Sequence, residues 1–403
     1  MTINNEHKKL NVPNKREQNQ TCLDSAEREG LRPKGNVPNL RFPEFQGEWK
    51  EHKLEDITAE IGDGIHATPI YDDNGTFYFV NGNNISEYGI IITATTQKVT
   101  EEEALRNNAS ALNSYSILLS INGTVGNVAL YKNESIMLGK SACYINVSSN
   151  INRNYIFYYL MMPKCQFYFT SELTGTTIKN LSLKSVRKTK VLLPNANEQS
   201  KIARLFDAIN ERIATQNKII DKLQSLIKGI AQKIVRCNKP NVRLSECLEC
   251  KSSTLQESDV YEQGTYPVYG ANGIVGYLDN YNTEGEAIYI IKDGSGVGTV
   301  SYVTGKCSAT GTLNTLQAKE GYSLQYLYYL LKVFNFEPYK TGMAIPHIYF
   351  KDYGKAKVFC PSYTEQLRYA RLLSAIDNKL SIEQNILTEL RLQKQYLLRQ
   401  MFI

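Results

Sequence analysis

The sequence of 403 residues contains little histidine or tryptophan, with four histidines and a single tryptophan, Trp49. The histidines show none of the spacings of a metal-binding HExxH helix. No apolar run approaches the length of a membrane-spanning helix, and the first 30 residues are polar and charged without the apolar core of a signal peptide. These absences argue against a membrane protein and a metalloprotease, and make the cytoplasm the expected location.

The eight cysteines are scattered along the chain. Cys247 and Cys250 form a CxxC pair, but a second CxxC or a nearby histidine that would complete a zinc site is lacking. Ordinary reduced cysteines are therefore predicted, with a metal site as the alternative.

Motifs that carry catalysis are also missing. None of the 12 prolines precedes another proline or an aspartate. This excludes the Asn/Asp-Pro-Pro-aromatic loop of adenine methyltransferases and the usual Pro-Asp of a restriction nuclease core. Residues 139–141 resemble the end of a phosphate loop, but Glu134 stands where that loop needs glycine. The glycine-rich residues 293–298 lie between two strand-like runs, which predicts a turn between strands. The sequence predicts no catalytic residue, metal or cofactor in this chain.

What the chain does contain is an internal duplication. Residues 175–194 and 342–361 share glycine, isoleucine, lysine, valine and proline at matching positions, always 167 residues apart. The same offset carries Glu198 and Gln199 onto Glu365 and Gln366, and continues to Leu390. Upstream the copies drift, with offsets of 171 for residues 155–160, 172 for 124–128 and 190 for 53–57. Such self-similarity indicates a repeat in which loops of different length connect the same elements.

Each copy ends in a segment with apolar residues three and four positions apart. They occur at 202, 205, 209, 213, 220, 223, 227, 230 and 234, and again at 369, 372, 376, 380, 387, 390, 397 and 401. This spacing predicts two helices of roughly 40 residues, each about 60 Å long, with a coiled-coil seam. Neither helix can bury its seam alone, so antiparallel pairing within the chain is expected, and pairing with other chains is the alternative.

Two details of these helices carry further expectations. Asn197 and Thr364 are the expected helix caps, each followed by a glutamate that suits the helix dipole. Lys394 stands where the first helix has Ile227, a polar interruption that could set the register of the pair.

The remaining sequence predicts mixed domains. Alternating segments at 76–80, 116–120, 128–131, 287–291 and 300–303 predict strands, and aromatic-rich segments at 154–162 and 325–334 predict helices. The predicted fold is α+β, with two mixed α/β domains separated by two long helices in an antiparallel coiled coil and a pseudo-twofold internal repeat. The expected boundaries are a disordered leader at 1–39, a domain at 40–194, a helix at 195–238, a domain at 239–361 and a helix at 362–403.

Basic and polar residues gather at the end of each domain. Acidic residues are absent between Glu172 and Glu198, where Lys179, Lys184 and Lys190 lie, and the matching window carries several lysines and His347. Cations with hydroxyl or amide donors suit phosphate contacts, although charge runs are also typical of a solvated face. Loops at 63–74, 81–88, 269–282 and 292–295 supply the donors and acceptors that base contacts need. The net charge of +6 fits nucleic-acid binding and also many unrelated soluble proteins.

Several segments, in this order and in a duplicated frame, resemble the specificity subunits of type I restriction–modification enzymes. They are residues 39–45, 62–69, 121–126, 174–178, 266–270 and 273–277, together with both helices that begin with Glu-Gln. The resemblance covers roughly residues 40–403.

The resemblance implies a DNA specificity subunit with two target-recognition domains, each recognising one half of a bipartite, asymmetric site in double-stranded DNA. The helices would set the spacing and dock two modification (methyltransferase) subunits. Those partners would bring S-adenosylmethionine and methylate adenine at N6, and separate restriction subunits that use ATP and Mg²⁺ would translocate and cleave. This chain would be non-catalytic. The competing hypothesis is a coiled-coil adaptor with two protein-binding domains.

The Gly-Thr-Thr segment that begins at Gly175 carries the leading candidates for DNA contact. Residues 343–346 depart from this segment, which leaves the matching role in the second copy open. The complete set of candidate DNA-binding residues is Asp63, His66, Thr68, Asn83, Asn122, Thr124, Thr176, Thr177, Lys179, Asn180, Lys184, Tyr269, Asn272, Lys292, Ser295, His347 and Lys351.

Overall fold

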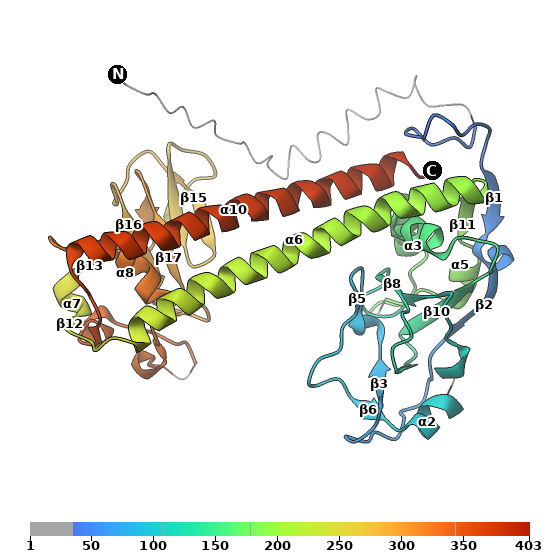
Figure 1. Cartoon of the computed structure of the whole chain (residues 1–403), viewed down its shortest axis with the longest axis horizontal. Helices are drawn as coiled ribbons and strands as arrows, with labels where there is room; N and C mark the ends of the chain where they lie inside the picture. The colour runs from blue at the N-terminus through green and yellow to red at the C-terminus, as the bar shows by residue number, and fades with distance from the viewer. Residues whose placement is uncertain (1–34, 108, 178, 343) are drawn as a thin grey trace. The chain divides into compact units, whose positions relative to one another are not determined.

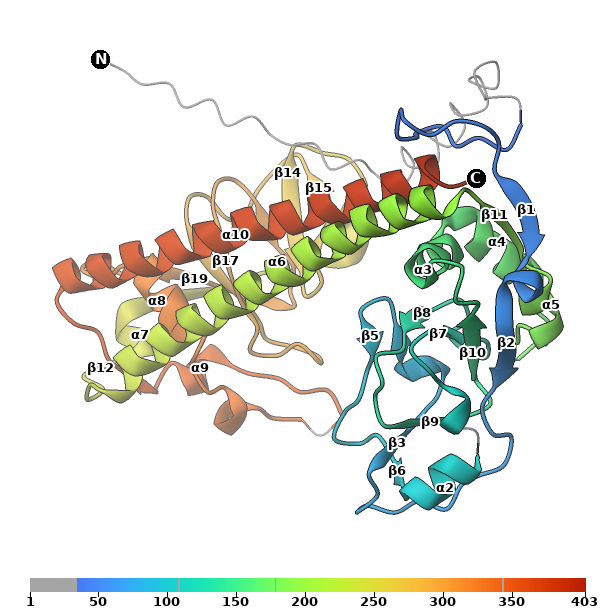
Figure 2. The same ribbon diagram turned by 45° about the vertical axis from the view of Figure 1, so that its right-hand side comes forward.

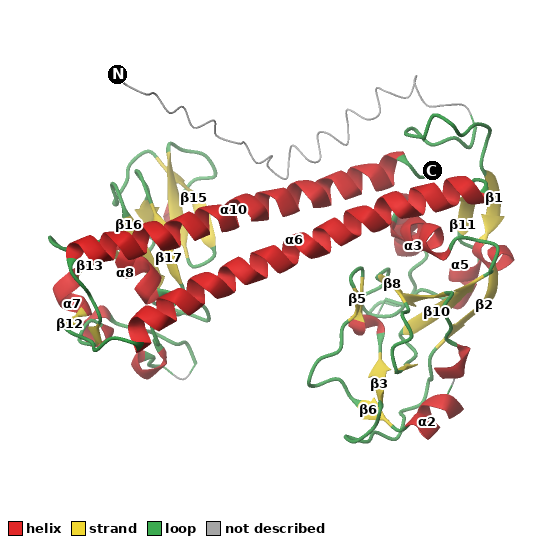
Figure 3. Cartoon of the chain, viewed as in Figure 1, coloured by secondary structure: helices red, strands yellow, loops and turns green. Residues whose placement is uncertain are grey.

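The computed structural model describes residues 35–403, except residues 108, 178 and 343 (Figure 1). Most of the expected leader at 1–39 lies outside the described residues. The chain divides into two compact units: the first holds the described residues up to Ile213 together with Glu389–Ile403, and the second holds Ala214–Thr388. Each unit contains one mixed domain and parts of both long helices, and the strands all belong to the mixed domains (Figure 3).

The first unit is built on a four-stranded antiparallel sheet of order β2-β10-β7-β8 (Figure 2). Its strands are β2 (Thr58–Asp63), β7 (Ser116–Ser120), β8 (Val128–Leu130) and β10 (Ala142–Val147). Alternate residues face two different cores, as the strand period of two requires. Ile117 and Leu119 join the core that contains helix α3 (Arg153–Met161), whereas Leu118 joins a core formed with a second sheet.

That second sheet has the order β6-β3-β9, and smaller elements surround the two sheets. β3 (Phe77–Val80) pairs antiparallel with β6 (Lys98–Val99) and parallel with β9 (Ile136–Leu138). Four further elements are β1 (Lys50–Lys53), which pairs with β11 (Lys190–Leu193), and the hairpin of β4 (Ile85–Ser86) and β5 (Gly89–Ile90). The short helices are α2 (Glu101–Arg106), α4 (Pro163–Ser171) and α5 (Leu183–Arg187).

The second unit repeats this plan. Its main sheet has the order β13-β19-β16-β17, formed by β13 (Leu248–Ser252), β19 (Leu313–Ala318), β16 (Ala287–Ile291) and β17 (Val300–Val303). Its second sheet has the order β15-β14-β18, and β14 (Tyr266–Gly270) again pairs parallel with β18 (Ser308–Ala309) and antiparallel with β15 (Gly273–Leu278). The remaining elements are β12 (Val242–Arg243) paired with β20 (Lys357–Val358), α7 (Leu244–Cys247), α8 (Leu324–Leu331) and α9 (Phe350–Tyr353). The duplication therefore extends over both sheets of the mixed domain, and the strands and helices expected from the sequence are confirmed.

A buried glutamine fastens each long helix to its domain in the same way. Gln199 accepts a hydrogen bond from the backbone of Asn152 (3.0 Å) and donates one to the carbonyl of Pro194 (2.9 Å). Gln366 makes the equivalent two bonds in the second unit, both at 2.9 Å. Because both glutamines are buried, each hydrogen bond gives a partner to a polar group that would otherwise be unsatisfied.

The long helices are α6 (Ala196–Arg236) and α10 (Tyr363–Gln400). The expected caps were wrong, because Asn195 and Ser362 accept the bonds from the first-turn amides, one position before each helix. The seam keeps the expected spacing but several predicted members lie outside it, such as Leu372, which is 49% exposed. The buried positions between the first turns and the C-terminal end are 202, 203, 206, 209, 213, 216, 220, 227, 231 and 234, and 370, 373, 380, 383, 387, 390, 394 and 398.

The two helices are antiparallel in each unit. In the first unit the ring of Phe206, early in α6, packs 5.6 Å from that of Phe402, just after α10. In the second unit Asn241, after α6, donates to the carbonyl of Cys360, before α10, and Gln216 bonds Glu383. The pairing of the helices within the chain is confirmed.

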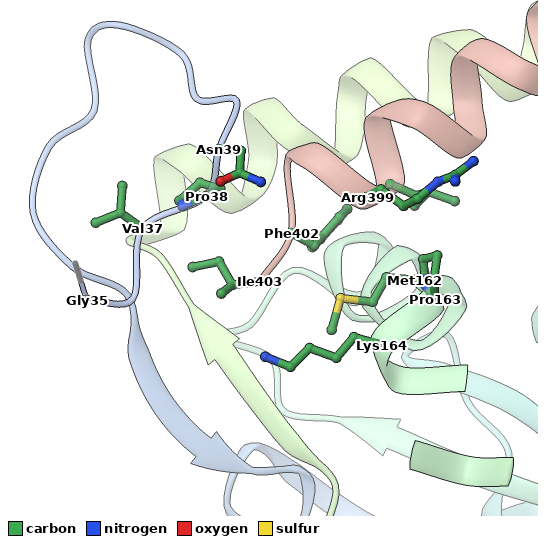
Figure 4. A pocket seen from close by; sticks show the side chains of 11 residues that line it. Gly35, Val37, Pro38, Asn39, Met162, Pro163, Lys164, Arg399, Phe402 and Ile403 are labelled. Atoms are coloured by element: carbon green, nitrogen blue, oxygen red, sulfur yellow. The ribbon is translucent and has the colours of Figure 1, made fainter. Parts of the chain in front are cut away.

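The C-terminal residues complete the core of the first unit. Met401 and Phe402 are buried in the cluster that also contains Trp49, and the carbonyl of Gln400 accepts a bond from the backbone of Leu40 (2.9 Å). A pocket at this junction is lined by both ends of the described chain and by the start of α4, with Ile403, Met162 and Lys164 among its walls (Figure 4).

Candidate nucleic-acid interface

Two loops meet at one end of the main sheet in the first unit. The turn after β7 (residues 121–127) contains Gly123 and Gly126, whose positive φ angles of 75° and 97° suit glycine. The loop before α5 (residues 174–181) is closed by the pairing of Thr174 with Asn180. The backbone of Gly123 donates to the carbonyl of Lys179 (3.2 Å), and that of Leu181 donates to Ile121 (2.8 Å). We call the two loops together the loop pair.

The second unit forms an equivalent loop pair from residues 292–299 and 341–348. Gly294 donates to the carbonyl of Pro346 (3.0 Å), and Ile348 donates to that of Lys292 (2.9 Å). Thr341 pairs with His347 as Thr174 does with Asn180. The expected turn between strands at 293–298 is confirmed. Residues 344–346 differ in sequence from the matching part of the first copy, yet the backbone of Pro346 and His347 pairs with the neighbouring turn as that of Lys179 and Asn180 does. The matching role in DNA contact stays a prediction.

The side chains at the centre of the loop pairs differ in charge. In the first unit the bridged residues are Asn122 and Asn180, and in the second they are Asp293 and His347. The carboxylate of Asp293 bonds His347 Nδ1 at 2.7 Å and Lys292 Nζ at 2.7 Å. Partial burial raises the pKa of Asp293, but the bonds from Lys292 and His347 outweigh it and leave the pKa below its usual value. The carboxylate therefore stays ionised at neutral pH and holds two donors beside the loop.

Other polar residues surround the first loop pair. Gly82, Asn122 and Ser141 lie so close that a Cβ on Gly82 would stand 2.8 Å from the Ser141 carbonyl and 3.1 Å from that of Asn122. Ser141 Oγ accepts from the backbone of Gly82 and donates to Asn81 Oδ1. At the adjacent end of β2, Asp63 Oδ2 lies 2.9 Å from His66 Nε2. The ends of β2, β7 and β10 thus bring three polar segments together.

Within each unit the structure brings several of the candidate residues together. In the first unit the loop pair and its immediate neighbours hold Asp63, His66, Asn83, Asn122, Thr124, Thr176, Thr177, Lys179 and Asn180, and in the second unit the loop pair holds Lys292, Ser295 and His347. Exposed positions that lie in other segments of the described chain are Thr68, Lys184 in α5, Asn272 in the β14–β15 turn and Lys351 in α9. The expected loop at 269–282 is wrong in part, because Tyr269 belongs to β14 and its ring packs 5.7 Å from that of Tyr289.

The basic window before α6 is less uniform than its sequence. Lys179, Lys184 and Lys188 are exposed, whereas Lys190 pairs with Glu51 of the neighbouring strand at 2.9 Å. The guanidinium of Arg187 donates to the backbone carbonyl of Ile61 at 2.7 Å. Pairing across the sheet brings in an acidic residue from 139 positions away, which the sequence window could not reveal.

Three polar residues of the interface were absent from the sequence-based candidates. Asp293 and Asn81 lie in the loops 292–295 and 81–88 that were expected to supply base contacts, but neither was named singly. Ser141 belongs to the segment 139–141 that was considered as a phosphate loop. The duplication contains a signal that points to Asp293. Asn122, which was a candidate, precedes Gly123, and Asp293 precedes the equivalent Gly294 in the second copy.

Within the described part of the chain, no helix is long and apolar enough to cross a membrane. The same residues contain no cluster of three or more histidine, cysteine or acidic side chains that could hold a metal ion.

Comparison with known proteins gives this architecture a family. The model of the type I restriction modification DNA specificity domain matches twice, over residues 46–225 and 239–392. The chain belongs to this family. Both family matches cover one mixed domain and the greater part of the helix that follows it, which agrees with the duplicated plan.

Individual proteins similar to this chain agree with the family assignment. A protein of Mycoplasma genitalium named as a type I specificity subunit is 24% identical over 315 residues, 71% of this chain and 80% of the relative. One of Mycoplasma pneumoniae is 25% identical over 294 residues, 66% of this chain and 76% of the relative. The crystal structure of the type I system S subunit from M. genitalium shares the fold, with a TM-score of 0.62 and 19% identity over 91% of this chain and 99% of the other. These matches support a DNA-specificity role and give no support to the coiled-coil adaptor.

Proposed function

We propose that this specificity subunit recognises a bipartite, asymmetric site in double-stranded DNA, with one loop pair for each half. The observation that carries the proposal is that equivalent backbone clamps present different polar side chains, Asn122 and Asn180 in one unit and Asp293 and His347 in the other. Sequence-specific contacts need donors and acceptors held in fixed geometry, and a repeated frame with changed side chains supplies two distinct recognition surfaces.

The chemistry of modification and restriction would reside in partner subunits. In this proposal the chain is non-catalytic and docks two methyltransferase subunits that bring S-adenosylmethionine, with restriction subunits that use ATP and Mg²⁺. A second solved structure, from work on complex assembly in the type I system, resembles this chain with a TM-score of 0.51 and 15% identity, over 88% of this chain and 97% of the other. The complex would act in the cytoplasm, where its DNA lies.

The decisive experiment is production of the chain together with the methyltransferase subunit of its own system, followed by mapping of methylated adenines. We expect one split motif whose methylation disappears when this chain is omitted. Methylation that continues unchanged without the chain would contradict the proposal. Exchange of residues 239–360 for the equivalent domain of another specificity subunit should alter one half of the motif only, and a change in both halves would contradict the assignment of one half to each domain.

Phosphate contacts can be tested by salt dependence and matched lysines. The slope of log K against log salt is negative, and each lost contact with duplex DNA should make it less negative by about 0.9. Lys179→Ala, in the first loop pair, should weaken binding and make this slope less steep. Lys190→Ala is the matched control, because Lys190 already pairs with Glu51. Equal effects from both substitutions would mean that the loop pair does not contact the phosphates.

A further inference from the structure

Two polar side chains are buried in the middle of the helix seam. Gln216 of α6 and Glu383 of α10 are 7% and 6% exposed. The amide of Gln216 donates to the backbone carbonyl of Glu383 at 3.0 Å and also to its carboxylate. The carboxylate is paired with Lys379 on the same helix as well. Among the described residues 200–236 and 367–390, these are the only two polar side chains that are buried.

The partners occupy equivalent positions in the two copies of the repeat. They are 167 residues apart, which is the offset that relates the two helices throughout the duplication. In an antiparallel pair related by a twofold axis, a position meets its own equivalent only where that axis crosses the seam. The apolar pattern of each helix also has a gap of seven residues, between 213 and 220 and between 380 and 387, and these two residues fill the gaps.

A buried polar pair of this kind discriminates between ways of pairing. In the observed register each partner satisfies the other, whereas a shift of four residues, about one helical turn, would place Gln216 against Leu387 and Glu383 against Ile220, both of which are apolar seam residues. Pairing of α10 with α10 of a second chain would bring Glu383 against Glu383, and two carboxylates in one buried site repel. Only the pairing of α6 with α10 matches an amide donor with a carboxylate acceptor.

We propose that Gln216 and Glu383 select the pairing of α6 with α10 over the pairing of α10 with α10 and fix its register. The proposal goes beyond DNA recognition and does not depend on it. Its consequence lies at the other end of α10: because this helix is uninterrupted, its register determines whether Leu398, Met401 and Phe402 reach the core of the first unit.

The single tryptophan reports on this docking. Trp49 is 2% exposed, its ring lies 6.1 Å from that of Tyr155, and Tyr155 lies 5.3 Å from Phe402. Departure of Phe402 would admit water to this cluster and shift the tryptophan emission to longer wavelength. Emission and molecular mass in solution therefore measure register and chain pairing without a label.

The test compares four full-length variants. Gln216→Glu places two carboxylates in the seam, and we expect red-shifted emission at pH 8 that reverts near pH 5, where a shared proton lets one carboxyl group donate to the other. The exchange of partners, Gln216→Glu with Glu383→Gln, should restore the emission and mass of the native chain at pH 8. Glu383→Gln alone keeps an amide donor and acceptor and should remain close to native.

The double variant Gln216→Leu with Glu383→Leu is expected to fold, because it removes two buried polar groups. We expect it to lose unique pairing, with mixed oligomers and a fraction of red-shifted emission. Native emission and a single native mass for this variant would overturn the proposal, as would an exchange variant that is as disturbed as Gln216→Glu. Methylation mapping of the same variants is independent: if the native chain directs no methylation, the proposed function fails while emission and mass still decide the inference.

Discussion

The two units repeat one frame but bury different polar groups within it. In the first unit Glu198 is fully buried at the start of α6, and the guanidinium of Arg41 donates to it at 2.7 and 2.8 Å. In the second unit the equivalent Glu365 is exposed and accepts from Ser362 at 2.9 Å. The difference arises because the segment before β1 folds over the start of α6 and supplies Arg41. A shared backbone therefore fixes where polar groups stand, while neighbouring segments decide whether they become buried.

A second contrast concerns the size of the buried side chains at equivalent core positions of the two units. Ile57 and Leu193 are buried in the core of the first unit, and their equivalents are Cys247 and Cys360, whose sulfur atoms lie 3.8 Å apart. The hydrogen bond from Cys360 lowers the pKa of the Cys247 thiol, and it outweighs burial, which acts in the opposite direction. The same backbone positions therefore hold two small, weakly polar side chains in the second unit and two branched aliphatic side chains in the first.

The largest expected effect tests whether the shared frame is equally stabilising in both units. Tyr155 and Tyr326 are buried, and each hydroxyl donates at 2.7 Å to a carbonyl of the segment before the long helix. Truncation of either to alanine should cost about 4 kcal/mol in its own unit. Hydrogen exchange measures each unit separately, and phenylalanine is the control, at a cost of about 1 kcal/mol. A loss at Tyr155 without one at Tyr326 would break the equivalence.

The next effect should differ between the units. Glu198→Ala leaves the partly buried Arg41 without its carboxylate partner, with only the carbonyls of Gln46 and Gly47 to accept its bonds, and should cost about 3 kcal/mol. Glu365→Ala removes an exposed carboxylate and should cost about 0.5 kcal/mol. Denaturation followed by Trp49 emission reports on the first unit, and hydrogen exchange reports on the second. Equal costs would show that burial does not distinguish the two glutamates.

A smaller effect concerns Lys394, which occupies the position of Ile227 and pairs with Glu87 of the β4–β5 turn at 2.7 Å. Burial raises the pKa of Glu87, but the bonds from Lys394 outweigh it and the pKa lies below its usual value. The stabilisation is therefore present above the ordinary carboxyl pKa and is lost as the pH falls through the lowered one. Lys394→Ile should cost about 1 kcal/mol at pH 7, and addition of Glu87→Gln should recover most of it and flatten the pH dependence. Trp49 unfolding curves between pH 3 and 7 provide the measurement, and an unchanged curve would rule out the ion pair as a contributor.

The last effect is of similar size and should be the same in both units. Gly123 and Gly294 have φ angles of 75° and 94°, and a Cβ on either would meet open space. Alanine at either position should cost about 1 kcal/mol through backbone strain alone. If the loop pairs contact DNA, each substitution should weaken recognition of one half-site only, measured with DNA that carries one intact half. Weakened binding to both halves would contradict separate recognition by the two units.

The sequence predicted the fold class because its evidence is periodic and repeated. The 3–4 spacing gave both long helices, and alternating segments gave β7, β8, β16 and β17 close to their observed bounds. The candidate site was predicted in part, since Asn122, Lys179 and Asn180 do meet in one loop pair. Tyr269 was misplaced because an aromatic residue in a polar segment suits a loop and a partly buried strand equally well.

Partners across the chain were beyond the sequence. Lys394 was noticed as an interruption, but its partner Glu87 is 307 positions away, and the polar pair of the seam is Gln216 with Glu383. The sequence by itself determined the duplication, the two helices and the elements of each domain, because these depend on local spacing and on similarity between copies. Only the tertiary structure decided which charges are paired, which loops join and which polar residues meet in the seam. Periodicity records that a side chain is buried, whereas the packing of distant segments decides what it is buried against.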